Sequence, residues 1–132
     1  MRLVIDTNIY SDLAEGKEDV VEYLANFRGA LYIPVIVLGE LNYGFRKGSK
    51  QKMNEENLMQ FKEIFNAGII CVDEDVASIY STLVLNLEKR GKKIPVNDAW
   101  IAACCMSIGG TLYSRDEKHF SDIENLNMVA IS

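Results

Sequence analysis

Short apolar runs alternate along the chain with longer stretches in which apolar residues recur every three or four positions. The segment Leu3-Val4-Ile5 is one such run, and a continuous apolar run is typical of a strand buried on both faces of a parallel sheet. The longer stretches have the periodicity of amphipathic helices. This alternation predicts an α/β fold, a three-layer α/β/α sandwich around a short parallel sheet.

Proline and glycine residues limit the predicted elements. We expect Pro34 to stop the second strand, Gly91 to end the helix before it, and Gly68 to end an earlier helix. The predicted strands are 3–5, 30–33, 69–72, 111–113 and 128–131. The predicted helices are 8–14, 18–28, 35–46, 54–66, 75–90 and 97–108.

The composition fits one globular domain over residues 1–132, since 132 residues with 48% hydrophobic content can bury a sizeable core. No apolar stretch is long enough to span a membrane, and the N-terminus turns acidic at Asp6, too early for a signal peptide. We therefore expect a cytoplasmic protein. An odd number of cysteines without C-x-x-C spacing favours buried small side chains over disulfides or a zinc site; the cysteines are Cys71, Cys104 and Cys105.

The net charge of −5 does not indicate nucleic-acid binding, but the basic residues are unevenly distributed. Two short runs are basic, and they consist of Arg46, Lys47, Lys50 and Lys52, and of Lys89, Arg90, Lys92 and Lys93. Basic residues near the end of a helix also complement its dipole, so solvated helix ends explain either run alone. Two runs on either side of an acidic pocket would suit a polyanion laid across it.

Two aspartates lie within a few residues of the ends of predicted strands. Asp6 follows the strand at 3–5, and Asp116 follows the strand at 111–113. In an open α/β sheet, ligands bind outside the carboxyl ends of the strands, where both residues lie. Each also has a simpler explanation, because aspartate commonly caps a helix or occupies a turn.

Two further acids lie in predicted helices with apolar surroundings. The helical neighbours of Glu40 include Ile36 and Val37, so its carboxylate needs a cation, a basic partner or a raised pKa. Asn97 is a natural N-cap, which places Asp98 in the first helical turn, where the dipole favours an acid. Asp98 also shares the face of the buried residues three, four and seven positions further on, which favours a site over a surface charge.

The four acids Asp6, Glu40, Asp98 and Asp116 together predict a divalent metal site. Carboxylates about 4 Å apart repel by roughly 4 kcal/mol at an effective dielectric constant of about 20, so such a cluster needs cations or protons. With no paired cysteines and a single histidine, the ligands suit hard ions such as Mg²⁺ or Mn²⁺. One or two such ions can activate water and stabilise charge on a phosphate, which predicts phosphodiester hydrolysis.

The remaining polar candidates have supporting roles. Asn8 and Ser114 carry side chains that can hydrogen-bond a metal ligand or a water. His119 is the only histidine and cannot make a zinc site by itself, so we expect it to be a structural or surface residue. No serine is accompanied by a triad base, and neither a P-loop nor a G-x-G-x-x-G motif occurs.

Four motifs resemble the PIN domain in their order and spacing, and most closely the VapC-type toxins of bacterial and archaeal toxin–antitoxin pairs. The motifs are Asp6-Thr7-Asn8; Pro34 through Gly39-Glu40-Leu41-Asn42-Tyr43-Gly44; Asn97-Asp98-x-x-Ile101-Ala102-Ala103; and Ser114-Arg115-Asp116-x-x-His119-Phe120. Each motif is weak alone, and together they cover nearly the whole chain. Ser114 stands where threonine is frequent in the family, a change that keeps the hydroxyl group.

The resemblance implies a parallel sheet of strand order 3-2-1-4-5, a homodimer, and a Mg²⁺- or Mn²⁺-dependent endoribonuclease that acts on tRNA or other structured RNA. It also implies a small antitoxin, encoded alongside, that blocks the groove. By position, Asp6 and Asp98 would be the principal metal ligands. Glu40 would bind metal directly or through water, and Asp116 would complete the site and help to orient the attacking water. The two basic runs are our candidates for RNA contacts.

Two alternatives remain open from the sequence. A PIN-like nuclease of RNA processing or DNA cleavage would share the four acids, although the short chain, without an added RNA-binding domain or long helical insert, favours the toxin. An inactive domain with an acidic pocket would serve as a binding module, but the presence of all four acids argues against loss of activity.

Overall fold

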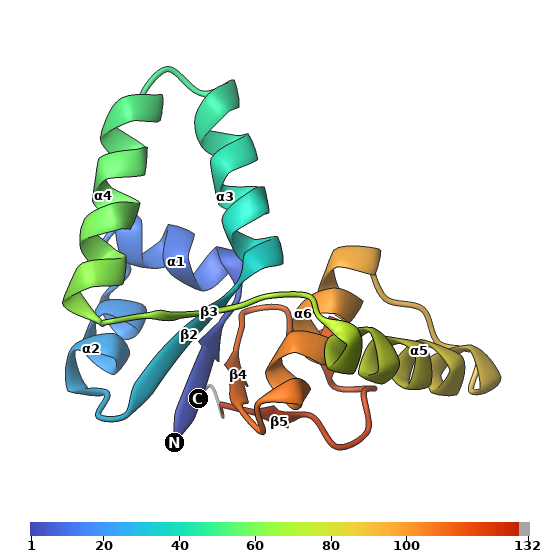
Figure 1. Cartoon of the computed structure of the whole chain (residues 1–132). Helices are drawn as coiled ribbons and strands as arrows, with labels where there is room; N and C mark the ends of the chain where they lie inside the picture. Colours follow the sequence, from blue (N-terminus) through green and yellow to red (C-terminus); the bar gives the residue numbers. More distant parts are fainter. Residues whose placement is uncertain (130–132) are drawn as a thin grey trace.

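A computed structural model describes residues 1–129, and at its centre lies a 5-stranded parallel sheet (Figure 1). The strands lie in the order β3-β2-β1-β4-β5, which confirms the predicted fold class and strand order. They are β1 (Arg2–Ile5), β2 (Ala30–Pro34), β3 (Gly68–Ile70), β4 (Thr111–Tyr113) and β5 (Asn127–Met128).

β1 lies in the middle of the sheet, between β2 and β4. Val4 is in register with Tyr32 of β2 and with Leu112 of β4. The side chains of Leu3, Val4 and Ile5 are all fully buried, although successive residues of a strand point to opposite faces. Both faces of β1 are therefore covered, which is why a continuous apolar run encodes this strand.

Helices α1 and α2 lie on one side of the sheet, and α5 and α6 lie on the other (Figure 1). Within residues 1–129 the helices are α1 (Thr7–Ala14), α2 (Glu18–Asn26), α3 (Val35–Lys47), α4 (Gln51–Ile64), α5 (Glu74–Lys89), α6 (Val96–Ser107) and α7 (Glu117–Phe120). The predicted helices match these apart from small shifts at their ends and the earlier start of α4, whereas the short α7 was not predicted.

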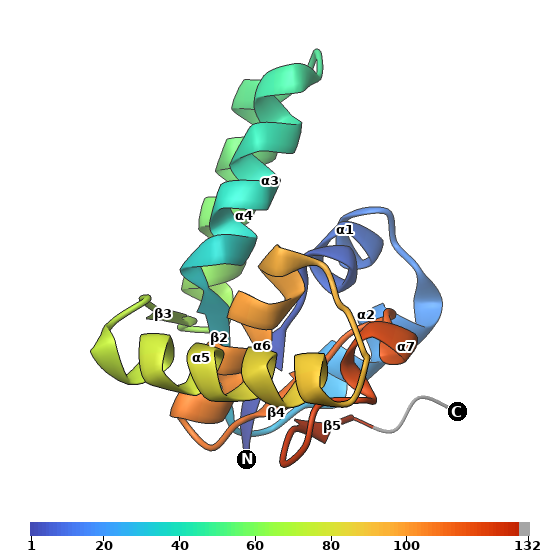
Figure 2. The ribbon, with the colours of Figure 1, turned by 90° about the vertical axis from the view of Figure 1, so that its right-hand side faces the viewer.

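α3 and α4 form a hairpin that projects from the sheet, with its connecting turn at the far end (Figures 1 and 2). The predicted start of the second helix at residue 54 is wrong, because α4 begins at Gln51. No side chain caps this end. The residues from Gln51 onward are good helix formers, so the helix starts soon after Gly48 without a capping signal.

Gly68 does not end α4 as predicted. The helix ends at Ile64, and Asn66 adopts a left-handed conformation with φ 47° in the turn that follows. Gly68 instead begins β3, where an added Cβ would lie 2.7 Å from the ring of Tyr32, closer than real contacts allow. The glycine is therefore needed because the Tyr32 ring packs directly against the backbone.

The third strand is shorter than the predicted 69–72, and it ends at Ile70. In the part of the chain that the structure describes, β3 is an edge strand that pairs only with β2, so pairing stops where β2 ends at Pro34. Cys71 lies beyond the strand and is exposed, which corrects the expectation that it is buried. Cys104 and Cys105 are buried on α6, as expected.

The predicted fifth strand at 128–131 is only partly described. Met128 lies in β5, whereas residues 130 and 131 lie outside the described residues. Among the helices of residues 1–129, none combines the length and the apolar character needed to cross a membrane.

Candidate metal centre

Asp6 lies at the carboxyl end of β1, and its side chain is 3% exposed. Its backbone N–H donates to the carbonyl of Tyr113 (3.0 Å), which ties this position to the end of β4. Its carboxylate accepts hydrogen bonds from the Thr7 N–H at Oδ1 (2.7 Å) and from the Ser114 hydroxyl at Oδ2 (2.6 Å). Asp6 therefore caps α1, as its simpler explanation held, and at the same time occupies the end of the central strand.

Ser114 and Asn8 connect Asp6 to Asp116. The Ser114 hydroxyl donates to Asp6 and accepts from the Asp116 N–H (3.0 Å), and this serine is fully buried. The Asn8 amide on α1 donates to Oδ2 of Asp116 (2.9 Å). Both predicted supporting residues are thus hydrogen-bonded to candidate metal ligands, from two different elements.

Asp98 lies in the first turn of α6, as predicted, with its side chain 14% exposed. The predicted N-cap at Asn97 is wrong, since α6 begins at Val96 and Pro95 takes the cap position. No side chain caps this end of the helix. Asn97 instead donates from its amide to Oε2 of Glu40 (3.4 Å).

Glu40 lies halfway along α3 and is half-buried. Its Oε1 accepts a hydrogen bond from the hydroxyl of Thr7 (2.6 Å), so α3, α1 and α6 meet at this carboxylate. Within residues 1–129, no lysine or arginine forms a salt bridge with it. The basic partner considered from the sequence is therefore absent from the described part of the chain, where Thr7 and Asn97 are the hydrogen-bond donors to Glu40.

His119, which we expected to be a structural or surface residue, lies beside this group with its side chain 43% exposed. Its Nδ1 is 2.8 Å from Oδ2 of Asp98. The imidazole is presented by α7, a turn of helix that the sequence pattern did not indicate. The available signal was the spacing of three residues between Asp116 and His119, which places both on one side of a helical turn.

Burial and mutual repulsion disfavour ionised carboxylates in this centre. The pKa of Asp6 is raised to about 6, and burial is the largest cause. The hydrogen bonds from Ser114 and Thr7 lower this pKa, whereas the charges of Asp98 and Asp116 raise it. Burial also raises the pKa of Asp98. His119 opposes that shift, whereas Asp116 and Glu40 add to it.

One ligand atom from each of Asp98, Asp116 and His119 can be chosen so that all three lie within 4.8 Å of one another. Carboxylate oxygens suit hard divalent cations, and an imidazole nitrogen suits transition metals, so the donors fit an ion such as Mg²⁺ or Mn²⁺. Asp98 and Asp116 raise the pKa of Asp6, and Glu40 raises the pKa of Asp98, so Asp6 and Glu40 lie near this group. Asp6 and Glu40 are not members of this group of three, but hydrogen bonds through Ser114 and Asn97 connect them to the loop of Asp116 and to the helix of Asp98.

Arg115 fixes the loop that carries Ser114 and Asp116. Its Nε donates to Asp12 on α1 (2.8 Å), and its two terminal nitrogens donate to the two oxygens of Asp19 on α2 (2.6 and 2.8 Å). Two carboxylates thus engage this guanidinium. The guanidinium of Arg115, next to Asp116 in the sequence, therefore ties the loop after β4 to α1 and α2.

The two basic runs lie on different elements. Arg46 and Lys47 occupy the last turn of α3, at the end of the projecting hairpin, and the Lys47 amine lies 5.1 Å from the centre of the Tyr43 ring. The second run lies at the end of α5 and in the segment that leads to α6; Lys92 and Lys93 line a hollow of about 250 Å³ there. Lys89 belongs to the last turn of α5.

Arg90 is engaged within the fold, since both of its terminal nitrogens donate to the carbonyl of Asp122 (2.7 and 2.8 Å). This residue therefore differs from its lysine neighbours in the second basic run.

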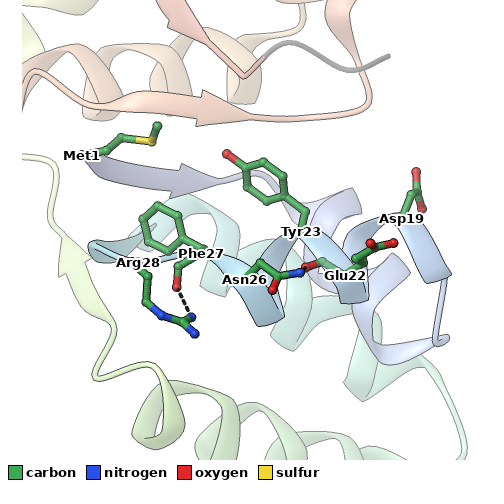
Figure 3. A pocket seen from close by; sticks show the side chains of 7 residues that line it. All are labelled: Met1, Asp19, Glu22, Tyr23, Asn26, Phe27 and Arg28. Atoms are coloured by element: carbon green, nitrogen blue, oxygen red, sulfur yellow. Dashed lines mark hydrogen bonds between the residues drawn. The ribbon is translucent and has the colours of Figure 1, made fainter.

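A separate hollow of about 560 Å³ lies along α2 and is not lined by any of the four acids (Figure 3). Tyr23 and Phe27 give it an apolar wall. Its basic member, Arg28, donates to the carbonyls of Ala25 and Phe27. The hollow therefore contains none of the predicted catalytic residues.

Comparisons with known proteins match nearly the whole chain. The family model of the PIN domain matches residues 3–126. Ribonuclease VapC2 of Rickettsia felis is 32% identical over 130 residues, which are 96% of this chain and 95% of that protein. The crystal structure of VapBC2 from Rickettsia felis bound to a promoter DNA fragment is similar with TM-score 0.90 and 27% identity, over 100% of both chains.

A second solved structure extends the likeness in fold. The structure of VapBC-5 from Mycobacterium tuberculosis, described as a member of the VapBC family of toxin–antitoxin systems, has a TM-score of 0.72 and 20% identity, and the match covers 98% of each chain.

Proposed function

The chain belongs to the PIN domain family, and from this premise we propose that it is a VapC-type endoribonuclease, the toxin of a toxin–antitoxin pair. The observation that carries the proposal is the convergence of four carboxylates at the carboxyl end of the central strands. Its substrate is tRNA or another structured RNA, and its 132 residues act as one nuclease domain in the cytoplasm.

The catalytic centre consists of Asp6, Glu40, Asp98 and Asp116, which hold Mg²⁺ or Mn²⁺. When bound, such a cation lowers the pKa of a coordinated water and offsets the negative charge of the phosphate. Asp6 and Asp98 are the principal ligands. The raised pKa of Asp6 supports this role, because a carboxylate whose ionised form is disfavoured gains most from a nearby cation.

The neighbouring polar residues orient these ligands. The Ser114 hydroxyl holds one oxygen of Asp6, and the Asn8 amide holds one oxygen of Asp116. Thr7 and Asn97 hold both oxygens of Glu40 between them. Hydrogen bonds of this kind fix the direction of a ligand before the cation arrives. Glu40 and Asp116 are then placed to orient the attacking water.

The partners follow from the same family. We propose that a small antitoxin, encoded alongside, blocks the groove, since the similar structures named above are of VapBC proteins. The active form is a homodimer, which light scattering of the purified chain tests directly. Contacts to RNA come from Arg46, Lys47, Lys89, Lys92 and Lys93, whereas Arg90 of the same basic run holds the Asp122 carbonyl.

Incubation of the purified chain, free of antitoxin, with total cellular RNA and with duplex and flap DNA tests the proposal. We expect discrete RNA fragments in Mn²⁺ and none in EDTA, and mapping of the fragment ends names the target. Cleavage of DNA alone would favour a different PIN-like nuclease. No cleavage of either polymer would favour a non-catalytic binding module.

A further inference from the structure

We propose that His119 is a ligand of the divalent cation, so that the centre binds through an imidazole nitrogen as well as carboxylate oxygens and favours Mn²⁺ over Mg²⁺. This inference rests on the proposed metal-dependent function. It adds a residue outside the four acids and a prediction about which ion the centre selects.

The spacing of the donor atoms fits one ion. Nδ1 of His119 lies 2.8 Å from Oδ2 of Asp98, and ligand atoms of Asp98, Asp116 and His119 lie within 4.8 Å of one another. Around an octahedral ion with bonds of about 2.1 Å, adjacent ligand atoms are about 3 Å apart and opposite ones about 4.2 Å apart. The three donors therefore need only small movements to coordinate a single cation.

The backbone holds the imidazole in this place. His119 lies three residues after Asp116, and its N–H donates to the Asp116 carbonyl (2.9 Å) at the start of α7. The next residue, Phe120, is 1% exposed and anchors the turn in the core. Asp116 and His119 are thus presented together by one short, anchored turn.

The side chain of His119 is available to an ion. It is 43% exposed, and its one hydrogen-bond partner within residues 1–129 is Asp98. A histidine that served only to pack would be enclosed by apolar side chains. A histidine that only oriented Asp98 would leave the cation with oxygen ligands alone, so the two roles differ in whether nitrogen contacts the metal.

The imidazole predicts the choice of ion. Mg²⁺ prefers oxygen ligands and retains several waters, whereas imidazole nitrogen binds first-row transition metals more readily. Removal of the imidazole should therefore weaken Mn²⁺ binding more than Mg²⁺ binding. We expect a loss of Mn²⁺ affinity on the order of tenfold or more in His119→Gln, with a smaller loss for Mg²⁺.

Pulsed electron paramagnetic resonance of the Mn²⁺-loaded chain tests the ligand directly. His119 is the only histidine, so imidazole ¹⁴N modulation of the bound Mn²⁺ signal can come from no other side chain. We expect this modulation in the wild type and in Lys118→Gln, an exposed neighbour, and its loss in His119→Gln.

Mn²⁺ that binds to the wild type without ¹⁴N modulation would overturn the ligand role and leave His119 as a positioning residue for Asp98, while the proposed function stands. Failure of the wild type to bind Mn²⁺ at all would overturn both. Because the wild-type spectrum decides the question, the test does not depend on whether His119→Gln folds.

Discussion

Asp6 is kept in a position where its ionised form is unfavourable without a cation. Its side chain is 3% exposed, it is surrounded by the core at the end of β1, and Asp98 and Asp116 add negative potential. The hydrogen bonds from Thr7 and Ser114 recover only part of this cost, since the pKa still rises from 3.8 to about 6. A residue held in this way ties the stability of the metal-free protein to pH and to metal.

The sign of this dependence follows from the raised pKa. The protonated form of Asp6 is favoured in the folded state, so its contribution to stability is present below pH 3.8 and is lost as pH rises through about 6. A shift of about two units corresponds to about 3 kcal/mol. We expect Asp6→Asn to lack this loss, because its amide carries no charge and can still bond Ser114 and Thr7.

Thermal unfolding of the wild type and Asp6→Asn in EDTA, between pH 4 and pH 7.5, measures this difference. The variant should gain stability relative to the wild type as pH rises, so that it is the more stable protein at pH 7.5. An equal dependence of stability on pH in the two proteins would contradict the claim that burial disfavours the ionised form of Asp6.

At the scale of elements, the centre depends on how the loop after β4 is tied to α1 and α2. Arg115 joins Asp12 and Asp19, and its backbone N–H donates to Oδ1 of Asn8 (3.3 Å). The same Asn8 side chain donates to Asp116. The loop, the two helices and a candidate metal ligand are thus linked through one short chain of hydrogen bonds.

Arg115→Gln should therefore weaken Mn²⁺ binding, on the order of tenfold, although residue 115 is not itself a ligand. Arg28→Gln is the matched control, because within residues 1–129 the Arg28 guanidinium donates only to backbone carbonyls near its own helix. Calorimetric titration of both variants with Mn²⁺ provides the comparison. Equal Mn²⁺ affinities in the two variants would show that the hydrogen bonds of Arg115 do not position Asp116.

The elements could be predicted where hydrophobic burial alone determines them. β1 and α6 carry apolar runs long enough to identify them, and the acids at their ends are conspicuous against that background. The start of α4 and the short α7 carry no such signal. The role of Gly68 was predicted wrongly, because a glycine is needed there to make room for the ring of Tyr32, which lies on another strand.

The candidate site was predictable as a set of residue types but not as a set of contacts. The four acids stood out because each was placed at a strand end or on an apolar helix. The contact between His119 and Asp98 could not be predicted, because it joins residues 21 positions apart on two helices. The bonds from Thr7 and Asn97 to Glu40 likewise join three helices and are set by their packing.

At the scale of the whole molecule, the proposed function requires an acidic protein to bind a polyanion. The net charge is −5, so RNA binding depends on where the basic residues lie. Lys92 and Lys93 lie just before α6, the helix that carries Asp98, whereas Arg46 and Lys47 lie at the end of the projecting hairpin. The first pair leads into the helix that carries Asp98, and the second pair follows Glu40 on α3.

Charge reversal of Lys89, Lys92 and Lys93 should weaken RNA binding and flatten its salt dependence. If all three contact phosphates, the slope of log K against log salt concentration should become shallower by about 2. Arg90 is left unchanged, because it holds the Asp122 carbonyl. Binding is measured across a salt series in an Asp98→Asn background that prevents cleavage. A slope identical to that of the parent would place the RNA path elsewhere, with reversal of Arg46 and Lys47 as the next comparison.

The central claim is that carboxylates brought together from distant positions hold the cation that cleaves RNA. Its most direct test is the initial rate of RNA cleavage against Mn²⁺ concentration for the wild type, Asp98→Asn and Asp75→Asn. Asp75 is the matched control, since it is an exposed acid in the first turn of α5, as Asp98 is an acid in the first turn of α6. The account predicts saturating, EDTA-sensitive rates for the wild type and Asp75→Asn, and a rate lower by on the order of 100-fold or more for Asp98→Asn. Full activity of Asp98→Asn at limiting Mn²⁺, or wild-type cleavage that persists in EDTA, would contradict it.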